Sequence, residues 1–76
     1  MIEQDLRAIV AKVAETSPDF PVTAHLRDDV GVDSVRAFEI VFEIEKVLGV
    51  AVPEDKYAEV RTFRDLLILV EATKGK

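Results

Sequence analysis

The sequence predicts an all-α fold: an antiparallel bundle of three main helices plus one short helix, with a long loop between the first two. Three observations carry this prediction. Apolar residues recur at three- and four-residue steps in three segments, as amphipathic helices require. Residues typical of helix starts and ends flank those segments. A proline- and aspartate-rich stretch separates the first two of them.

The first helix is expected over residues 2–16. Glu3 and Asp5 fall in its first turn, where negative charge suits the helix dipole. Ser17 and Pro18 follow the segment and end it. The apolar face consists of Ile2, Leu6, Ile9, Val10 and Val13.

Residues 17–33 are expected to form a long loop. They contain two prolines, one glycine and four aspartates, which argue against a continuous helix. Loops of this length are uncommon in small domains and often carry function. Five apolar residues are expected to hold the loop on the core: Phe20, Val22, Leu26, Val30 and Val32.

The second main helix is predicted over residues 34–48. Asp33 is a good N-cap, because its carboxylate can accept hydrogen bonds from the free N–H groups of the first turn. Gly49 supplies the residue that ends the helix. The apolar positions are Val35, Phe38, Val41, Phe42 and Leu48.

Two further helices are predicted after this one. Pro53 can start a short helix over residues 54–59. Thr62 and Asp65 resemble a capping box, which predicts a last helix from there to about Thr73. One aromatic and aliphatic stripe is expected to form most of the core: Phe38, Phe42, Leu48, Tyr57, Phe63, Leu66 and Leu69.

The composition predicts one folded domain over residues 1–76. Hydrophobic residues make up 49% of the chain and charged residues 33%, which suits a globular protein. The net charge of −5 repels phosphate backbones, so nucleic-acid binding is not expected. The chain has neither the basic start of a secretory signal nor an apolar run of the ~20 residues that span a bilayer. We therefore expect a cytoplasmic monomer without a membrane partner.

Ser34 is the most informative residue for function. It opens the strongest helical pattern after a polar loop, so its hydroxyl is expected at a helix N-terminus. Backbone N–H groups and the helix dipole favour a phosphate at such a place. The chain has few other reactive groups from which to build an active site, and it has no cysteine. Ser34 therefore has the features of a residue that is modified, not of a catalytic nucleophile.

Two other interpretations of this region are weaker. Asp28 and Glu39 have the spacing of the first and last ligands of a calcium loop, but Val30 and Val32 stand where oxygen ligands are required. His25 is the only histidine, and a Ser-His-Asp hydrolase in so small a domain has little room for an oxyanion hole and a cleft. We therefore expect no metal site and no catalytic residue.

The chain resembles the acyl carrier protein family, also called phosphopantetheine-binding carrier domains. Residues 31–35 (GVDSV) match the family pattern G-x-D-S followed by Leu, Ile or Val. Residues 48–53 (LGVAVP) and 62–66 (TFRDL) fit the link after the family's second helix and the start of its last one. The resemblance covers essentially the whole chain. It implies an acyl-carrier-like right-handed bundle.

The resemblance also implies a cofactor. A phosphopantetheinyl transferase would move 4′-phosphopantetheine from coenzyme A to Ser34. The thiol of that arm would then hold acyl intermediates as thioesters. The protein would be a discrete carrier in fatty-acid biosynthesis and not an enzyme. A carrier for polyketide, aminoacyl or other acyl units is the alternative within the class, and an unmodified acidic interaction module is the alternative outside it.

Partner enzymes are expected to meet the second helix. The resemblance implies that acyl-loading and acyl-processing enzymes with basic docking patches recognise Asp33, Val35, Arg36, Glu39 and Glu43. Val35 stands where leucine is commonest, and Arg36 where fatty-acid carriers are often acidic. The arginine favours a specialised carrier. Part of the apolar stripe would also line an acyl pocket: Phe38, Phe42 and Leu66.

Overall fold

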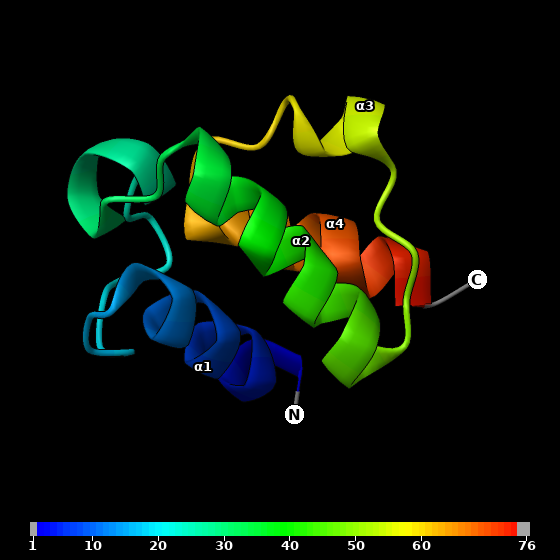
Figure 1. Ribbon diagram of the computed structural model, residues 1–76, viewed down its shortest axis with the longest axis horizontal. Helices are drawn as coiled ribbons and strands as arrows, with labels where there is room; N and C mark the ends of the chain where they lie inside the picture. The colour runs from blue at the N-terminus through cyan, green and yellow to red at the C-terminus, as the bar shows by residue number, and fades with distance from the viewer. Residues whose placement is uncertain (1, 75–76) are drawn as a thin grey trace.

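The computed structural model describes residues 2–74 and contains five helices (Figure 1). They are α1 (Ile2–Ala14), the π-helical turn η1 (Leu26–Val30), α2 (Ser34–Leu48), α3 (Glu54–Tyr57) and α4 (Phe63–Lys74). In Figure 1, α1 runs opposite to α2 and α4, and the short α3 lies above α4. The all-α prediction is confirmed. None of the helices within residues 2–74 has the length and hydropathy needed to cross a membrane.

The core lies where α1, α2 and α4 meet. α1 packs against both α2 and α4, and α3 packs against α4. Each fully buried aliphatic or aromatic side chain contributes roughly 1.5–3 kcal/mol relative to exposure. The largest fully buried side chains come from these three helices: Leu6, Val10, Ile40, Ile44, Phe63, Leu66 and Val70.

The boundaries of α2 follow the prediction, and its caps are those expected. The Asp33 carboxylate accepts a hydrogen bond from the Arg36 backbone N–H at 2.9 Å. Gly49 ends the helix with φ of 68°, a conformation that costs glycine little. α1, however, ends at Ala14, before the predicted Thr16, because Glu15 adopts a left-handed φ of 57°.

Two predictions on local structure were wrong. Residues 26–30 were expected in a loop, but they form η1, in which the Val30 N–H donates to the His25 carbonyl at 3.1 Å. The Asp29 carboxylate accepts from the His25 N–H at 2.7 Å, and the His25 Nδ1 accepts from the Asp28 N–H at 3.2 Å. These local hydrogen bonds hold the turn together. The proline, glycine and aspartate content of the segment, from which a loop was predicted, does not reveal them. α3 is also shorter than predicted, because Val60 already bonds back to Tyr57 in a tight turn.

The predicted core was wrong for two phenylalanines. Phe38 is 69% exposed and Phe42 is 64% exposed. The inward face of α2 instead carries Ile40 and Ile44, which are fully buried. Since α2 has apolar residues on two sides, packing against α1 and α4 decides which side is buried. In the rest of the stripe, Phe63 and Leu66 are fully buried, and the others pack against the core while partly exposed: Leu48, Tyr57 and Leu69.

An arginine anchors the long loop to the helices. The Arg7 guanidinium lies 5.0 Å from the ring centroids of both Phe20 and Phe63, which contact each other edge to face. It donates hydrogen bonds to the carbonyls of Pro18 and Phe20 and pairs with Glu3. These contacts hold the first part of the loop against the helices. The loop then leads through η1 to the first residue of α2.

Candidate functional site

Ser34 is the first residue of α2, and its side chain is exposed. The chain reaches it through Gly31, whose φ of 88° ends η1 and turns the backbone toward α2. Asp33 stands in extended conformation before it, and its carbonyl accepts from the Ala37 N–H at 2.8 Å. The Ser34 hydroxyl thus lies at the positive end of a 15-residue helix.

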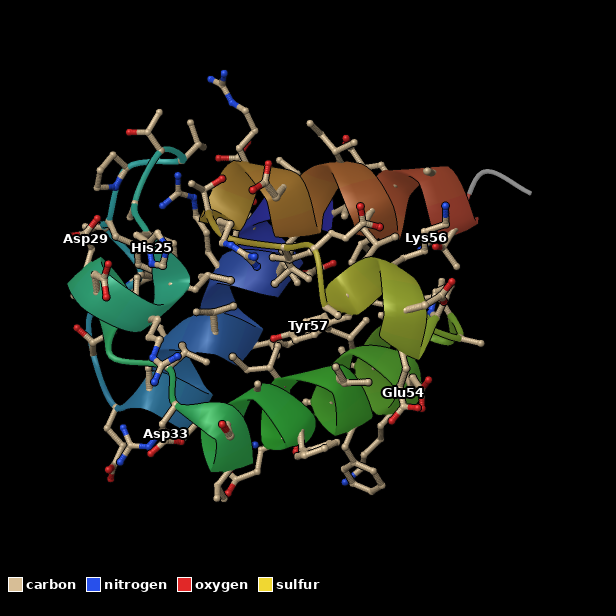
Figure 2. The ribbon with its side chains drawn as sticks, turned by 90° about the horizontal axis from the view of Figure 1, so that it is seen from above. His25, Asp29, Asp33, Glu54, Lys56 and Tyr57 are labelled. Atoms are coloured by element: carbon tan, nitrogen blue, oxygen red, sulfur yellow. The ribbon has the colours of Figure 1, made fainter. Side chains whose placement is uncertain are left out.

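Two hollows meet at Ser34. The α2–α3 hollow has a volume of about 430 Å³, and its walls are mainly apolar. It is lined by Ser34, Ala37, Phe38, Val41, Val52, Glu54, Tyr57 and Ala58. Figure 2 shows Tyr57 in the space between α3 and α2, and Asp33 at the start of α2.

The second hollow, the η1 hollow, lies beside η1 and is more polar. Its volume is about 590 Å³, and it shares Ser34, Ala37 and Tyr57 with the α2–α3 hollow. Its charged and titratable lining residues carry both signs: His25, Arg27, Asp28, Asp33 and Arg61. An anion on Ser34 would therefore share the hollow with two arginines and two aspartates, and the helix terminus would favour it.

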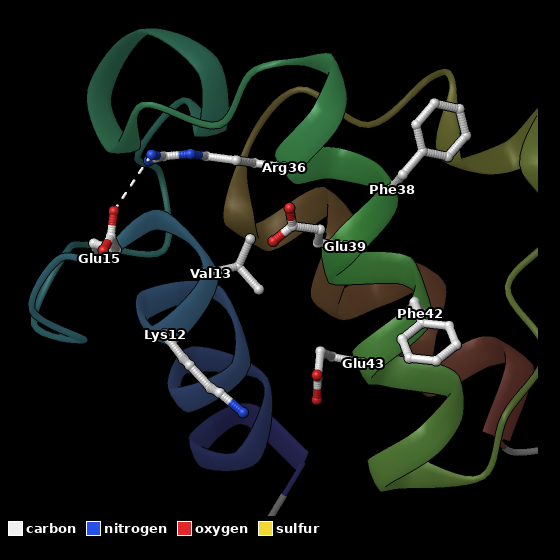
Figure 3. A pocket seen from close by; sticks show the side chains of 8 residues that line it. All are labelled: Lys12, Val13, Glu15, Arg36, Phe38, Glu39, Phe42 and Glu43. Atoms are coloured by element: carbon white, nitrogen blue, oxygen red, sulfur yellow. Dashed lines mark hydrogen bonds and ion pairs between the residues drawn. The ribbon is translucent and has the colours of Figure 1, made fainter.

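The outward face of α2 presents an apolar row. Val35, Phe38 and Phe42, the outer row, fall on one side of the helix and are 64–69% exposed. Figure 3 shows Phe38 and Phe42 pointing away from α1, whereas Glu39 and Glu43 point toward it. The two glutamates share a hollow with the basic side chains of Lys12 and Arg36. Their negative charge is thus partly offset.

Arg36 contacts α1. Its Nη1 donates to the Ala14 carbonyl at 3.3 Å, and its Nη2 pairs with the Glu15 carboxylate at 3.4 Å (Figure 3). A cation at this place also suits the carboxyl end of α1. The arginine that departs from the pattern of fatty-acid carriers therefore joins two helices.

The structure brings only some of the predicted site residues together. Phe38 lines the α2–α3 hollow with Ser34, and both Phe38 and Phe42 line the hollow beside α1. Leu66 is fully buried and lines neither of them. Sequence reasoning assigned Tyr57 to the core, against which it does pack, but missed that this residue also lines both hollows. Its signal was present: a single tyrosine in a short helix leaves a hydroxyl that needs a polar surrounding.

Fold and site together define a small helical domain with an exposed serine at the start of a main helix. The profile of the family described as "Phosphopantetheine attachment site" matches residues 4–70. An acyl carrier protein from Treponema pallidum is 34% identical over 61 residues, which cover 79% of this chain and 78% of that protein. The chain belongs to the acyl carrier protein family, whose members carry phosphopantetheine.

Two further proteins are similar to this chain. The anthracycline acyl carrier protein DpsG from Streptomyces peucetius is 46% identical over 43 residues, which cover 57% of this chain and 51% of that protein. The structure of a candidate acyl carrier protein from Mycobacterium tuberculosis superposes with a TM-score of 0.83 at 24% identity. It covers 95% of this chain and 97% of the other, and it shows the shared fold.

The residues around Ser34 fit a phosphopantetheine group. An exposed hydroxyl is open to a transferase, and the helix terminus would favour a phosphodiester on it by about 0.3–1 kcal/mol. The η1 hollow would bring two arginines and two aspartates near the phosphate, and the α2–α3 hollow would offer apolar walls to what the arm carries.

Proposed function

We propose that Ser34 is the attachment residue and that the protein holds acyl intermediates as thioesters on its arm. It then delivers them to enzymes of the fatty-acid biosynthesis type. The observation that carries the proposal is the exposed Ser34 hydroxyl at the start of α2, where two hollows meet. Asp33 acts there as a helix cap, because its carboxylate is already bonded to the Arg36 N–H. The protein is a cosubstrate in this proposal, and its partners supply the catalysis.

The loading step transfers one phosphopantetheine group from coenzyme A to Ser34. Ser34 Oγ attacks the phosphorus of coenzyme A that bears the pantetheine, and a new O–P bond forms. The P–O bond to adenosine 3′,5′-bisphosphate breaks, and the hydroxyl proton passes to a base of the transferase. The helix terminus beside Ser34 then stabilises the anionic phosphodiester.

Partner enzymes dock on α2 in this proposal. The outer row supplies an apolar centre, and Asp33, Glu39 and Glu43 supply acidic groups for a basic rim on the partner. Exposed aromatic side chains of this size are typical anchors of protein interfaces. Arg36 contributes by fixing the end of α1 against α2.

A carrier for polyketide or another specialised acyl unit is the second candidate. The local identity of 46% with an anthracycline carrier favours it. So does Arg36, since its charge lies where fatty-acid carriers are often acidic. Both candidates share the arm on Ser34 and differ in the acyl group and in the enzymes that supply it.

The test is an intact-mass measurement after incubation with coenzyme A and a broad-specificity phosphopantetheinyl transferase. The protein should gain the mass of one phosphopantetheine, and Ser34→Ala should gain none. Ser17→Ala removes the other serine of the chain, which lies outside the helices, and should gain as much as the unaltered protein. No gain by the unaltered protein would overturn the carrier proposal and favour the unmodified interaction module.

A further inference from the structure

Tyr57 lines both of the hollows that meet at Ser34. It is the last residue of α3, and its ring lines both the α2–α3 hollow and the η1 hollow. Figure 2 shows it between α3 and α2, away from Lys56, which points outward from the same helix. An acyl chain that turned back from Ser34 into the α2–α3 hollow would therefore pass along this ring.

The Tyr57 side chain brings a hydrogen-bond donor to a hollow whose walls are mainly apolar. Ala37, Val41, Val52 and Ala58 make up much of the wall of the α2–α3 hollow. Burial raises the pKa of Tyr57 above its usual value of 10.0, so the group keeps its proton near neutral pH. No hydrogen bond within residues 2–74 contributes to that shift. The O–H group is therefore available to a ligand.

We propose that Tyr57 makes the α2–α3 hollow selective for acyl chains that bear an acceptor oxygen, such as a keto group, over fully reduced chains of equal length. The inference rests on the proposed attachment of the arm to Ser34. A reduced chain in the hollow would cover the hydroxyl without offering it a partner, which is unfavourable for a polar group. A keto oxygen would accept from it. Binding sites that form a hydrogen bond with a polar group of the ligand discriminate strongly against ligands that lack this group, because the polar group of the site is then left unpaired.

The experiment compares two loaded forms of the full chain. The transferase moves phosphopantetheine analogues from coenzyme A analogues to Ser34 and releases adenosine 3′,5′-bisphosphate. In these analogues an amide replaces the thioester, and the arm bears either a hexanoyl or a 3-oxohexanoyl group. Tyr57 is the only tyrosine and the chain has no tryptophan, so ultraviolet absorbance of the phenolate reports this residue alone. The 3-oxohexanoyl form should have the higher Tyr57 pKa, because an acceptor stabilises the protonated phenol. Its melting temperature should be higher by about 5 °C.

Tyr57→Phe is the matched variant, since it removes only the hydroxyl. The two loaded forms of this variant should melt at the same temperature. Equal pKa values and melting temperatures for the two loaded forms of the unaltered chain would overturn the inference, and so would a difference that persists in Tyr57→Phe. Intact mass confirms loading beforehand. A failure to load contradicts the attachment to Ser34, whereas loading without selectivity contradicts only the role of Tyr57.

Discussion

Asp65 closes the start of α4 with three hydrogen bonds. Its carboxylate accepts from the backbone N–H groups of Arg61 and Thr62, each at 3.1 Å. The Thr62 hydroxyl oxygen in turn accepts from the Asp65 N–H at 3.2 Å. The hydrogen bond from the Thr62 backbone N–H is the largest cause that holds the pKa of Asp65 below its usual value of 3.8, and the bond from the Arg61 N–H is the next. The capping box predicted from the sequence is therefore present, because its signal depends only on residues four apart or closer.

This residue makes the stability of the protein depend on pH. Because the folded-state pKa is lowered, the carboxylate stabilises the fold at pH values above the unfolded-state pKa near 3.8. The contribution is lost as the pH falls through the folded-state value. Asp65→Ala should therefore lower the free energy of unfolding by about 1 kcal/mol at pH 7, a typical value for a cap. The loss should shrink at pH 3.

Urea unfolding at the two pH values checks this prediction. Glu71→Ala, which removes an exposed carboxylate from the same helix, controls for the general loss of negative charge. An equal loss of stability at pH 7 and pH 3 in Asp65→Ala would mean that the carboxylate is not responsible.

At the scale of the helix, α2 shows what the sequence can and cannot predict. Its start and end follow from Asp33 and Gly49, because caps are local interactions. The face that α2 buries does not follow from local residues, because Phe38 and Ile40 are both apolar. Only contact with other helices selects one of them for burial. The same reason explains why the place of Tyr57 at both hollows was not predicted. Which face of a helix lines a hollow is a property of the packed bundle.

The exposed outer row leads to a prediction on docking. With the phosphopantetheinyl transferase as partner and coenzyme A saturating, Phe38→Ala should raise the KM for the carrier about tenfold. An apolar contact is screened little by salt, so the increase should persist at high ionic strength. Glu43→Gln should raise the KM at low salt only, since a charged rim is screened.

Ile68→Ala is the control for this prediction. Ile68 is an exposed apolar side chain on α4, outside the outer row, with 57% of its surface accessible. The variant should leave the KM unchanged. If Ile68→Ala and Phe38→Ala had the same effect, α2 would not be the docking helix.

At the scale of the whole molecule, Arg7 joins α1, the long loop and α4. Its guanidinium contacts the rings of Phe20 and Phe63 and donates to two loop carbonyls. Arg7→Met keeps much of the side-chain volume and loses these polar contacts. The free energy of unfolding should fall by about 2 kcal/mol.

Denaturant unfolding measures this loss, and Arg64→Met is the matched control. Arg64 is exposed on α4, and its side chain makes no hydrogen bond or ion pair that the structure describes within residues 2–74. Its replacement should change stability by less than about 0.5 kcal/mol. Equal losses in the two variants would contradict the role given to Arg7.

The attachment of the arm to Ser34 is tested most directly by locating the added mass on the chain. Trypsin cleaves after Arg27 and Arg36, and the resulting peptide 28–36 contains Ser34 as its only hydroxyl residue. After treatment with coenzyme A and a transferase, this peptide should carry one phosphopantetheine group and every other peptide none. A group found on any other peptide, or on none, would contradict the account.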